Sequence, residues 1–347
     1  MSMLDGLSGY SDGSAGAPPG TPQLAGALAG YAVRPPWEVA GIDYAVGPDS
    51  TPSKDPATIS MAGVSVDNAS RVVTISGNNV TLDGYNFALH GGYTVEVQGS
   101  NATITDSNFV MGSNPSYYLI QDYGNNLTLK YDTLDGTATT TNQSALVAVY
   151  GSNPVIQYDW FKNFGQHVIE MNQAAGVTTT LDYRFNLIEN GGQEPGAHLN
   201  FLQWGHGIAV DPLVAFNTTL QTPQAAAGEG FQFDGWPDAT ITGAVFSNNT
   251  MIARGGGAGS AMSFLMHPFG GNSTSGLSSG TASDNYFDIS AAYGAFYPVG
   301  SHPGLWSFSS NYNLSTGASL TVSGGTEAHA PATRALSRPH RPAPPRS

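Results

Sequence analysis

Two carboxylic acids and one histidine stand where they could cleave a glycosidic bond. Glu170 lies within residues 167–172 and Asp234 ends residues 231–234, both β-prone segments. If these segments are strands two coils apart in a stack, their backbones are separated by about 9.6 Å. Inverting glycosidases hold two carboxyl groups roughly 6.5–9.5 Å apart, so the pair predicts hydrolysis with inversion, with His198 as proton relay.

The sequence also offers alternatives to this catalytic assignment. Glu194 and Glu229, in neighbouring connections, are alternative acids. Each carboxylate and histidine is also of a type that commonly does no more than face solvent. His167 begins an inward-facing run, which favours a core position, and no tight histidine spacing indicates zinc. The sequence therefore predicts three catalytic candidates and no metal site.

Polar and aromatic residues near these candidates could hold a sugar. If the large apolar residues of each strand point inward, alternation turns their neighbours outward. The assumed inward residues are Ile169, Met171, Phe201, Phe231, Phe233, Phe264 and Met266, and the outward ones are Glu170, Asn172, His198, Asn200, Gln232, Asp234 and His267. Long Gly-rich connections at 189–197, 221–229 and 254–260 border this stripe. They predict a cleft over residues 160–270.

The substrate-binding prediction combines that stripe with three aromatic residues. Its members are Tyr150, Asn172, Asn200, Gln203, Trp204, Gln232, Trp236 and His267. Tyr150, Trp204 and Trp236 either offer flat surfaces on which sugar rings rest or cover the solenoid core. The sequence leaves these two alternatives open.

A short repeat must position all of these residues. A β-prone run leading to Asp or Asn and a large apolar residue returns nine times, at 81–87, 103–109, 128–134, 155–161, 180–187, 214–217, 245–251, 285–287 and 311–314. The first apolar residues, Phe87, Phe109, Leu134, Phe161 and Leu187, are 22, 25, 27 and 26 residues apart. A period of this size predicts a solenoid.

The repeat units are too short for helices and are rich in β-branched and aromatic residues. Equivalent strands of successive units then lie side by side around a shared core. The prediction is an all-β, single-stranded parallel β-helix of about nine coils. The recurring asparagines are predicted to be structural, because Asn tolerates left-handed turns and its amides can form ladders.

Residues 77–84 and 99–109, with their later counterparts, resemble the right-handed parallel β-helix repeat proteins of the pectin-lyase-like superfamily. The resemblance covers about residues 58–325 and implies right-handed coils and a role on polysaccharides. The polygalacturonase-type hydrolases of that group carry Asn-x-Asp, Asp-Asp, His-Gly and Arg-x-Lys motifs, and only Gly205-His206-Gly207 matches one of them here. The hydrolase prediction therefore draws little support from family motifs.

Two further functions stay open beside hydrolysis. A non-catalytic surface adhesin or carbohydrate-binding solenoid would use the same stripe only to hold sugar. A polysaccharide lyase would need a basic catalytic residue and, as the one cofactor under consideration, Ca²⁺. Lys162 and Arg184 lie one coil apart and could imitate the lyase arrangement, but they occupy different coil positions and no clear calcium motif surrounds them.

Charge and composition restrict the partners. Residues 1–333 hold seven basic against 25 acidic side chains, a formal charge of −18, and four arginines follow. Such a rod repels phosphate, so no nucleic acid partner is predicted, and a polyuronate would need a bridging cation. No apolar stretch could span a membrane. The predicted setting is extracellular or cell-surface, although no signal peptide is visible, and the oligomeric state is left open.

Composition also divides the chain. Residues 1–57 predict a flexible leader and N-terminal cap, in which Trp37 could cover the first coil. Residues 58–325 are the β-helix. Residues 326–347, rich in Pro and Arg, predict a disordered tail, either solvated or touching acidic partners.

Overall fold

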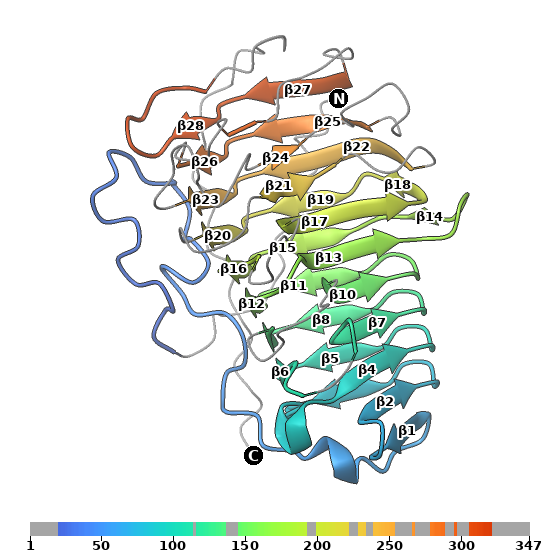
Figure 1. Cartoon of the computed structure of the whole chain (residues 1–347). Coiled ribbons are helices and arrows are strands. Elements are labelled where there is room, and N and C mark those ends of the chain that lie inside the picture. Colours follow the sequence, from blue (N-terminus) through green and yellow to red (C-terminus); the bar gives the residue numbers. More distant parts are fainter. Residues whose placement is uncertain are drawn as a thin grey trace.

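The chain folds into stacked coils made almost entirely of short strands (Figure 1). The structure, a computed structural model, describes residues 20–113, 116–136, 145–192, 199–221, 228–233, 239–253, 266–267, 278–288, 295–296 and 305–320. This part of the chain includes two 3₁₀ turns, η2 (Pro56–Thr58) and η3 (Leu89–Gly91). Among the residues described, no helix has the length and apolar character needed to cross a membrane.

The first sheet has nine strands, parallel except for an antiparallel hairpin of its first two. In spatial order they are β1 (Val64–Asp67), β2 (Val72–Ile75), β4 (Thr94–Val97), β7 (Ile120–Asp122), β10 (Ala145–Val149), β13 (His167–Asn172), β17 (Leu199–His206), β21 (Gly228–Gln232) and β24 (Met266–His267).

The second and third sheets complete each coil and are also parallel. The second contains β3 (Thr81–Asp83), β5 (Thr103–Thr105), β8 (Thr128–Lys130), β11 (Val155–Gln157), β14 (Thr178–Thr179), β15 (Asp182–Arg184), β18 (Ile208–Val210), β19 (Leu213–Ala215), β22 (Thr240–Ser247), β25 (Ser278–Ser283) and β27 (Trp306–Ser309). The third contains β6 (Asn108–Val110), β9 (Thr133–Asp135), β12 (Trp160–Lys162), β16 (Leu187–Glu189), β20 (Thr218–Gln221), β23 (Thr250–Ala253), β26 (Tyr286–Phe287) and β28 (Tyr312–Asn313).

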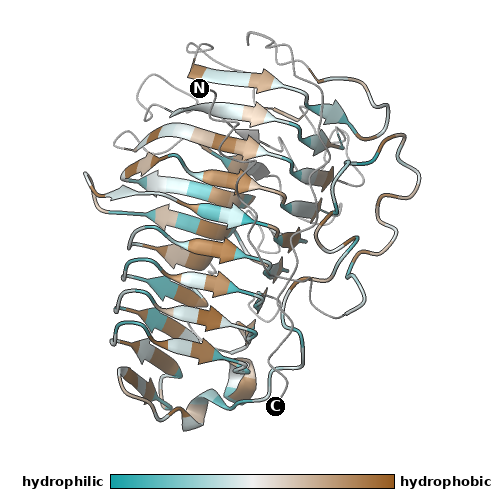
Figure 2. Ribbon diagram, turned by 180° about the vertical axis from the view of Figure 1, so that it is seen from behind, coloured by the Kyte–Doolittle hydropathy of each residue, from teal (hydrophilic) through white to brown (hydrophobic). Residues whose placement is uncertain are grey.

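The core of the stack is a set of apolar columns. One buried residue from each of nine strands of the second sheet forms a continuous column, which comprises Leu82, Ile104, Leu129, Ile156, Tyr183, Val214, Phe246, Ala282 and Phe308. Apolar and polar residues alternate along the strands (Figure 2). Every second side chain thus enters a shared interior, and the predicted all-β parallel β-helix is confirmed.

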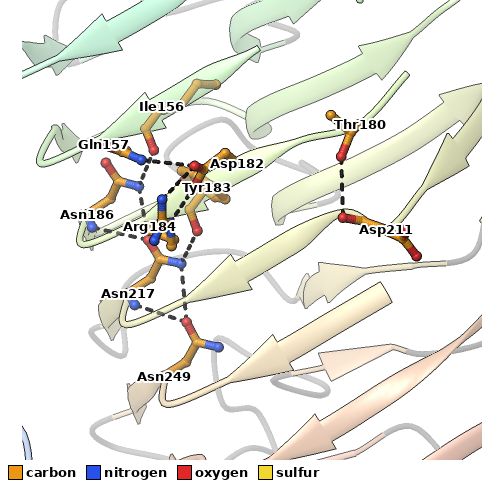
Figure 3. Close-up of polar contacts among 10 residues, drawn as sticks. All are labelled: Ile156, Gln157, Thr180, Asp182, Tyr183, Arg184, Asn186, Asp211, Asn217 and Asn249. Atoms are coloured by element: carbon orange, nitrogen blue, oxygen red, sulfur yellow. Dashed lines mark hydrogen bonds and ion pairs between the residues drawn. The ribbon is translucent and has the colours of Figure 1, made fainter. Parts of the chain in front are cut away.

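A buried ladder of side chains joins the coils at the turn between the second and third sheets (Figure 3). Its rungs are Ser107, Asp132, Asp159, Asn186, Asn217, Asn249, Asn285 and Asn311, all almost fully buried. In one rung, the Asn217 Oδ1 accepts a hydrogen bond from the Asn186 backbone N at 3.1 Å, and its Nδ2 donates to the Tyr183 carbonyl at 2.8 Å. The structural role predicted for these asparagines is confirmed.

The left-handed residue of this turn is not the ladder residue but the one before it. In four coils that residue is aromatic: Tyr131, Tyr158, Phe185 and Phe216 have φ between 58° and 63°. Bulky side chains rarely adopt this conformation, which costs on the order of 1–3 kcal/mol per residue. The rings stack outside the coils with centroids 5.1, 4.9 and 5.2 Å apart. Stacking and burial offset the backbone cost.

Residues 20–54 form a strap that covers this aromatic stack, seen as the blue trace beside the coils in Figure 1. At one end of the stack of coils the Ala32 and Val33 backbone N atoms donate to the Leu314 carbonyl at 3.0 and 3.2 Å. At the other end the Lys54 backbone N donates to the Gly84 carbonyl at 3.1 Å. The strap therefore connects the last described coil to the first.

The strap also corrects one expectation about the N-terminal region. Trp37 packs edge-on against Phe216 and Tyr286, with ring centroids 6.0 and 5.4 Å away. Both partners belong to later coils, so the prediction that Trp37 covers the first coil is wrong. The end of the stack at the first coil is formed by the antiparallel hairpin of β1 and β2.

A column of glycines lets successive coils approach closely where the chain leaves the first sheet. Gly77, Gly99, Gly124 and Gly151 follow β2, β4, β7 and β10. A Cβ atom added to Gly151 would lie only 1.5 Å from the Gly124 carbonyl oxygen, and one added to Gly124 would lie 2.1 Å from that of Gly99. Glycine is required here by backbone contact between coils.

Candidate functional site

The outer face of the first sheet carries two columns of polar and aromatic side chains. Strand register aligns the first column as Glu96, Gln121, Ala148, Glu170 and Gln203. The second column comprises Gln98, Tyr123, Tyr150 and Asn172, two positions further along each strand. Between the columns lie inward residues that include Asp122, Met171 and Trp204.

Two tyrosines at the middle of this face stack on each other. The rings of Tyr123 and Tyr150 are nearly parallel, with centroids 4.8 Å apart and an angle of 7° between the planes. Half of the Tyr123 side chain is exposed, and its hydroxyl donates to the Gln121 Oε1 at 3.0 Å. The Tyr150 side chain is hydrogen-bonded to that of Tyr118. We call Tyr118, Tyr123 and Tyr150 the tyrosine cluster.

Burial and nearby carboxylates keep the phenols of Tyr123 and Tyr150 protonated. Burial raises the pKa of Tyr150, followed in size by its hydrogen bond with Tyr118 and by Glu170. Burial also raises the pKa of Tyr123, with smaller contributions from Tyr150 and Glu96. The two glutamates thus flank the tyrosines on opposite sides. The Tyr123 hydroxyl donates its one proton to Gln121, so toward a ligand it can act as an acceptor, and the open ring face of Tyr123 can accept an apolar surface.

A buried acid lies next to the cluster on the inner side of the sheet. Asp122 is fully buried in the column of Met171, and burial raises its pKa to about 7, although its Oδ1 accepts a hydrogen bond from the Gly124 N at 3.0 Å. Its position in the core column keeps it away from a ligand on the outer face.

Four of the residues predicted from sequence come together on this outer face: Tyr150, Glu170, Asn172 and Gln203. Each is partly exposed. His198, Asp234 and Trp236 lie outside the described residues. His267 ends β24 opposite Gln232, with no side-chain position described.

Two other predicted residues are buried. Asn200 is fully buried, and its Nδ2 donates to the Gln232 Oε1 at 2.8 Å. Trp204 is 1% exposed and aligns with Met171 in an inward column. Trp204 therefore cannot offer a surface to a sugar ring. Of the two alternatives predicted for it, sugar binding or packing over the core, packing is correct.

Several residues of the face were missed by sequence reasoning. Glu96, Gln121, Tyr118 and Tyr123 precede the segment in which a cleft was predicted. A signal was present, because the segments 122–124 and 149–151 share the same Tyr-Gly ending. The interval from Tyr123 to Tyr150 equals the interval from Leu134 to Phe161 in the repeat, so one coil separates the two tyrosines and aligns them.

The two described carboxylates of the outer face stand too far apart for a hydrolase pair, and the two candidate lyase bases lie elsewhere. Glu96 and Glu170 are three strands apart, roughly 14 Å between backbones, which exceeds the separation in inverting glycosidases. Lys162 and Arg184 belong to different sheets and pair with Asp135 at 3.3 Å and Asp182 at 2.5 Å. Within the described ranges no three His, Asp or Glu side chains are grouped to hold a metal ion.

Comparisons with known proteins provide no relative from which a function could be transferred. No protein-family model, curated protein or solved structure matches this chain. The functional argument therefore depends on the outer face of the first sheet.

Proposed function

We propose that this protein binds an extended polysaccharide on the outer face of the first sheet, centred on the tyrosine cluster. The observation that carries the proposal is the stacked pair of the exposed Tyr123 and the partly exposed Tyr150 on a rigid sheet, flanked by Glu96 and Glu170. Sugar sites combine an aromatic surface with a few fixed polar groups that bind hydroxyls. Here Gln121, Asn172 and Gln203 supply such groups.

The wider setting of the proposal follows from the fold and composition. We propose an extracellular or cell-surface location, where polysaccharides are met, and distant membership of the pectin-lyase-like superfamily. The recurring short coils and the parallel sheets support that membership. The fold hosts many activities, so the binding proposal is argued from the face itself.

Truncation of Tyr123 should weaken binding without unfolding the protein. We expect Tyr123→Ala to reduce affinity for the bound polysaccharide at least tenfold, because truncating a central aromatic hot spot costs about 2 kcal/mol or more and about 1.4 kcal/mol corresponds to tenfold. Half of the side chain is exposed, so the melting temperature should change little. Affinity electrophoresis against a panel of soluble polysaccharides measures the change.

The control for this experiment removes exposed apolar surface elsewhere. Val210 is 40% exposed on β18 of the second sheet, and Val210→Ala should leave binding unchanged. Equal affinities for the Tyr123→Ala variant and the unaltered protein would exclude the tyrosine cluster as the binding site.

Hydrolysis is a second candidate function, favoured by the position of Glu170 on the outer face. Glu170 aligns with Ala148 on one side and Gln203 on the other, and its predicted partner, Asp234, follows Phe233 after β21. Release of reducing ends that is lost in both Glu170→Gln and Asp234→Asn would establish a hydrolase. Unsaturated products that form only with calcium would instead establish a lyase. Binding without any product supports the proposed binder.

A further inference from the structure

We infer that the ligand of this face is a neutral, hydroxyl-rich polysaccharide, and that Glu96 disfavours polyuronates. The inference rests on the proposed function and specifies its substrate class. Specificity between two polymers with the same backbone then depends on a single kind of group, the carboxylate.

The composition of the face carries this inference. Its two columns comprise Glu96, Gln121, Ala148, Glu170, Gln203, Gln98, Tyr123, Tyr150 and Asn172. None of these nine positions holds Lys or Arg, the residues that recognise carboxylates in pairs of hydrogen bonds. Apart from the carboxylates of Glu96 and Glu170, the polar groups are amides and phenols, which match neutral hydroxyl groups.

The position of Glu96 places a carboxylate beside the tyrosine that a sugar would contact. Glu96 lies on β4 between Thr74 and Gln121, and it is close enough to Tyr123 to act on the tyrosine electrostatically. A uronate ring on the open face of Tyr123 would bring a second carboxylate near it. Like charges at this range repel each other, and the repulsion is screened by salt.

The net negative charge of the rest of the chain adds to the preference for neutral over anionic polymers. Residues 1–333 carry a formal charge of −18, so a polyanion approaches the rod against a repulsive field. Neutral polymers are not subject to this field. We therefore expect a strong salt dependence for anionic polymers and little for neutral ones.

The test compares polymers matched in backbone and different in charge. The probes are polygalacturonate with its methyl ester, and carboxymethyl cellulose with hydroxyethyl cellulose. In at least one pair, the unaltered protein should bind the neutral polymer about tenfold more tightly at about 0.01 M salt, and the difference should shrink at about 1 M. Glu96→Gln should strengthen binding of the anionic partner about three- to tenfold and leave the neutral one unchanged.

Matched controls separate the outcomes. Asp211→Asn removes a carboxylate from an exposed turn after β18 and should not alter the preference. Anionic polymers bound as tightly as their neutral partners would overturn the inference and leave the proposed function standing. A neutral preference unchanged in Glu96→Gln would overturn the role of Glu96. Failure to bind these polymers and every other polysaccharide of the panel would overturn the inference together with the proposed function.

Discussion

Replacing both Asp132 and Asp159 with asparagine is expected to stabilise the protein at pH 7, by about 1–3 kcal/mol, the usual cost of a buried polar atom without a partner. Both acids are fully buried rungs of a ladder whose next five rungs are asparagines. Burial raises the pKa of each well above its usual range, and repulsion from Asp159 raises the pKa of Asp132 further. Folding at neutral pH must therefore either protonate them or bury charge.

The hydrogen bonds of the ladder explain why asparagine should fit. The Asp159 Oδ1 accepts from the Asp132 backbone N at 2.7 Å, as an asparagine oxygen would. Its Oδ2 is buried and makes no hydrogen bond of normal geometry, although the nearby Gln157 backbone N–H lowers the pKa of this acid. At residue 132 the Oδ2 accepts from the Lys130 backbone N at a long 3.3 Å, a contact that an amide nitrogen would give up. At the rung after Asp159, the Asn186 Nδ2 occupies the corresponding place and donates to the Ile156 carbonyl at 3.0 Å. An amide at residue 159 would reach the Leu129 carbonyl one coil earlier.

The same pair predicts a definite pH dependence. A carboxyl with a raised pKa in the folded state keeps its proton above pH 4, where the unfolded chain releases it. The free energy of unfolding therefore falls as pH rises from about 4 to the folded-state pKa, by up to about 1.4 kcal/mol per pH unit for each acid. Asp106, Lys130 and Tyr183 also act electrostatically on one or both acids and stay unchanged in the double variant.

Urea denaturation at about pH 5 and about pH 8 measures how the free energy of unfolding changes with pH. These two values are chosen because the pKa values of both acids are raised above about 4 in the folded state. The advantage of the double variant over the unaltered protein should be larger at the higher pH. Asp211→Asn, which removes an exposed carboxylate at another turn, should show no such gain. A double variant that is less stable than the unaltered protein at both pH values would contradict the assignment of these acids as neutral rungs.

Gly151→Ala is expected to destabilise the protein by more than about 3 kcal/mol, and it can prevent folding altogether. The added Cβ would lie 1.5 Å from the Gly124 carbonyl oxygen and 2.6 Å from its carbon. Both are backbone atoms of the preceding coil and cannot turn aside as a side chain can. The two coils would have to separate, which would break hydrogen bonds on both sides of the turn.

Thermal unfolding and proteolysis test this expectation. Gly20→Ala is the matched control, since its added Cβ would meet only the Ala45 Cβ at an ordinary 3.4 Å. If the Gly151→Ala protein is too unstable to purify and Gly20→Ala is not, the result agrees with the prediction. A melting temperature within a few degrees of the unaltered protein would show that the coils do not approach as closely as described.

The repeat made the fold predictable, because a short recurring period with strand-like composition leaves few alternatives. The alternation in β13 was also correct: Ile169 and Met171 are buried, and Glu170 and Asn172 are partly exposed. Both results depend on local sequence patterns that one coil is sufficient to show.

The site was harder to predict because it depends on exact strand register. Phe201 is fully buried, as predicted, but Leu202 rather than Phe201 aligns with Ile169, and an irregularity in the pairing of β17 with β21 lies beside it. An error of one residue in the predicted register exchanges inward and outward side chains along the rest of the strand. Trp204, which the prediction placed on the outer face, therefore lies in the core. Tyr123 and Tyr150 contact each other across two successive coils. The sequence predicts this contact only if the repeat spacing between Leu134 and Phe161 is assumed to apply to the two tyrosines as well.

The strap has a consequence for the order of events during synthesis. Ala32 leaves the ribosome long before Leu314, its hydrogen-bond partner, because most of the chain lies between them. At typical elongation rates of about 5–20 residues per second, this delay is roughly 15–60 s. Coils can stack from the amino end as they emerge, and the strap can cover the aromatic rings up to Phe216 once these have been made. Its contacts with Tyr286 and Leu314 form only after the last described coils, so an early segment of the chain completes its packing last.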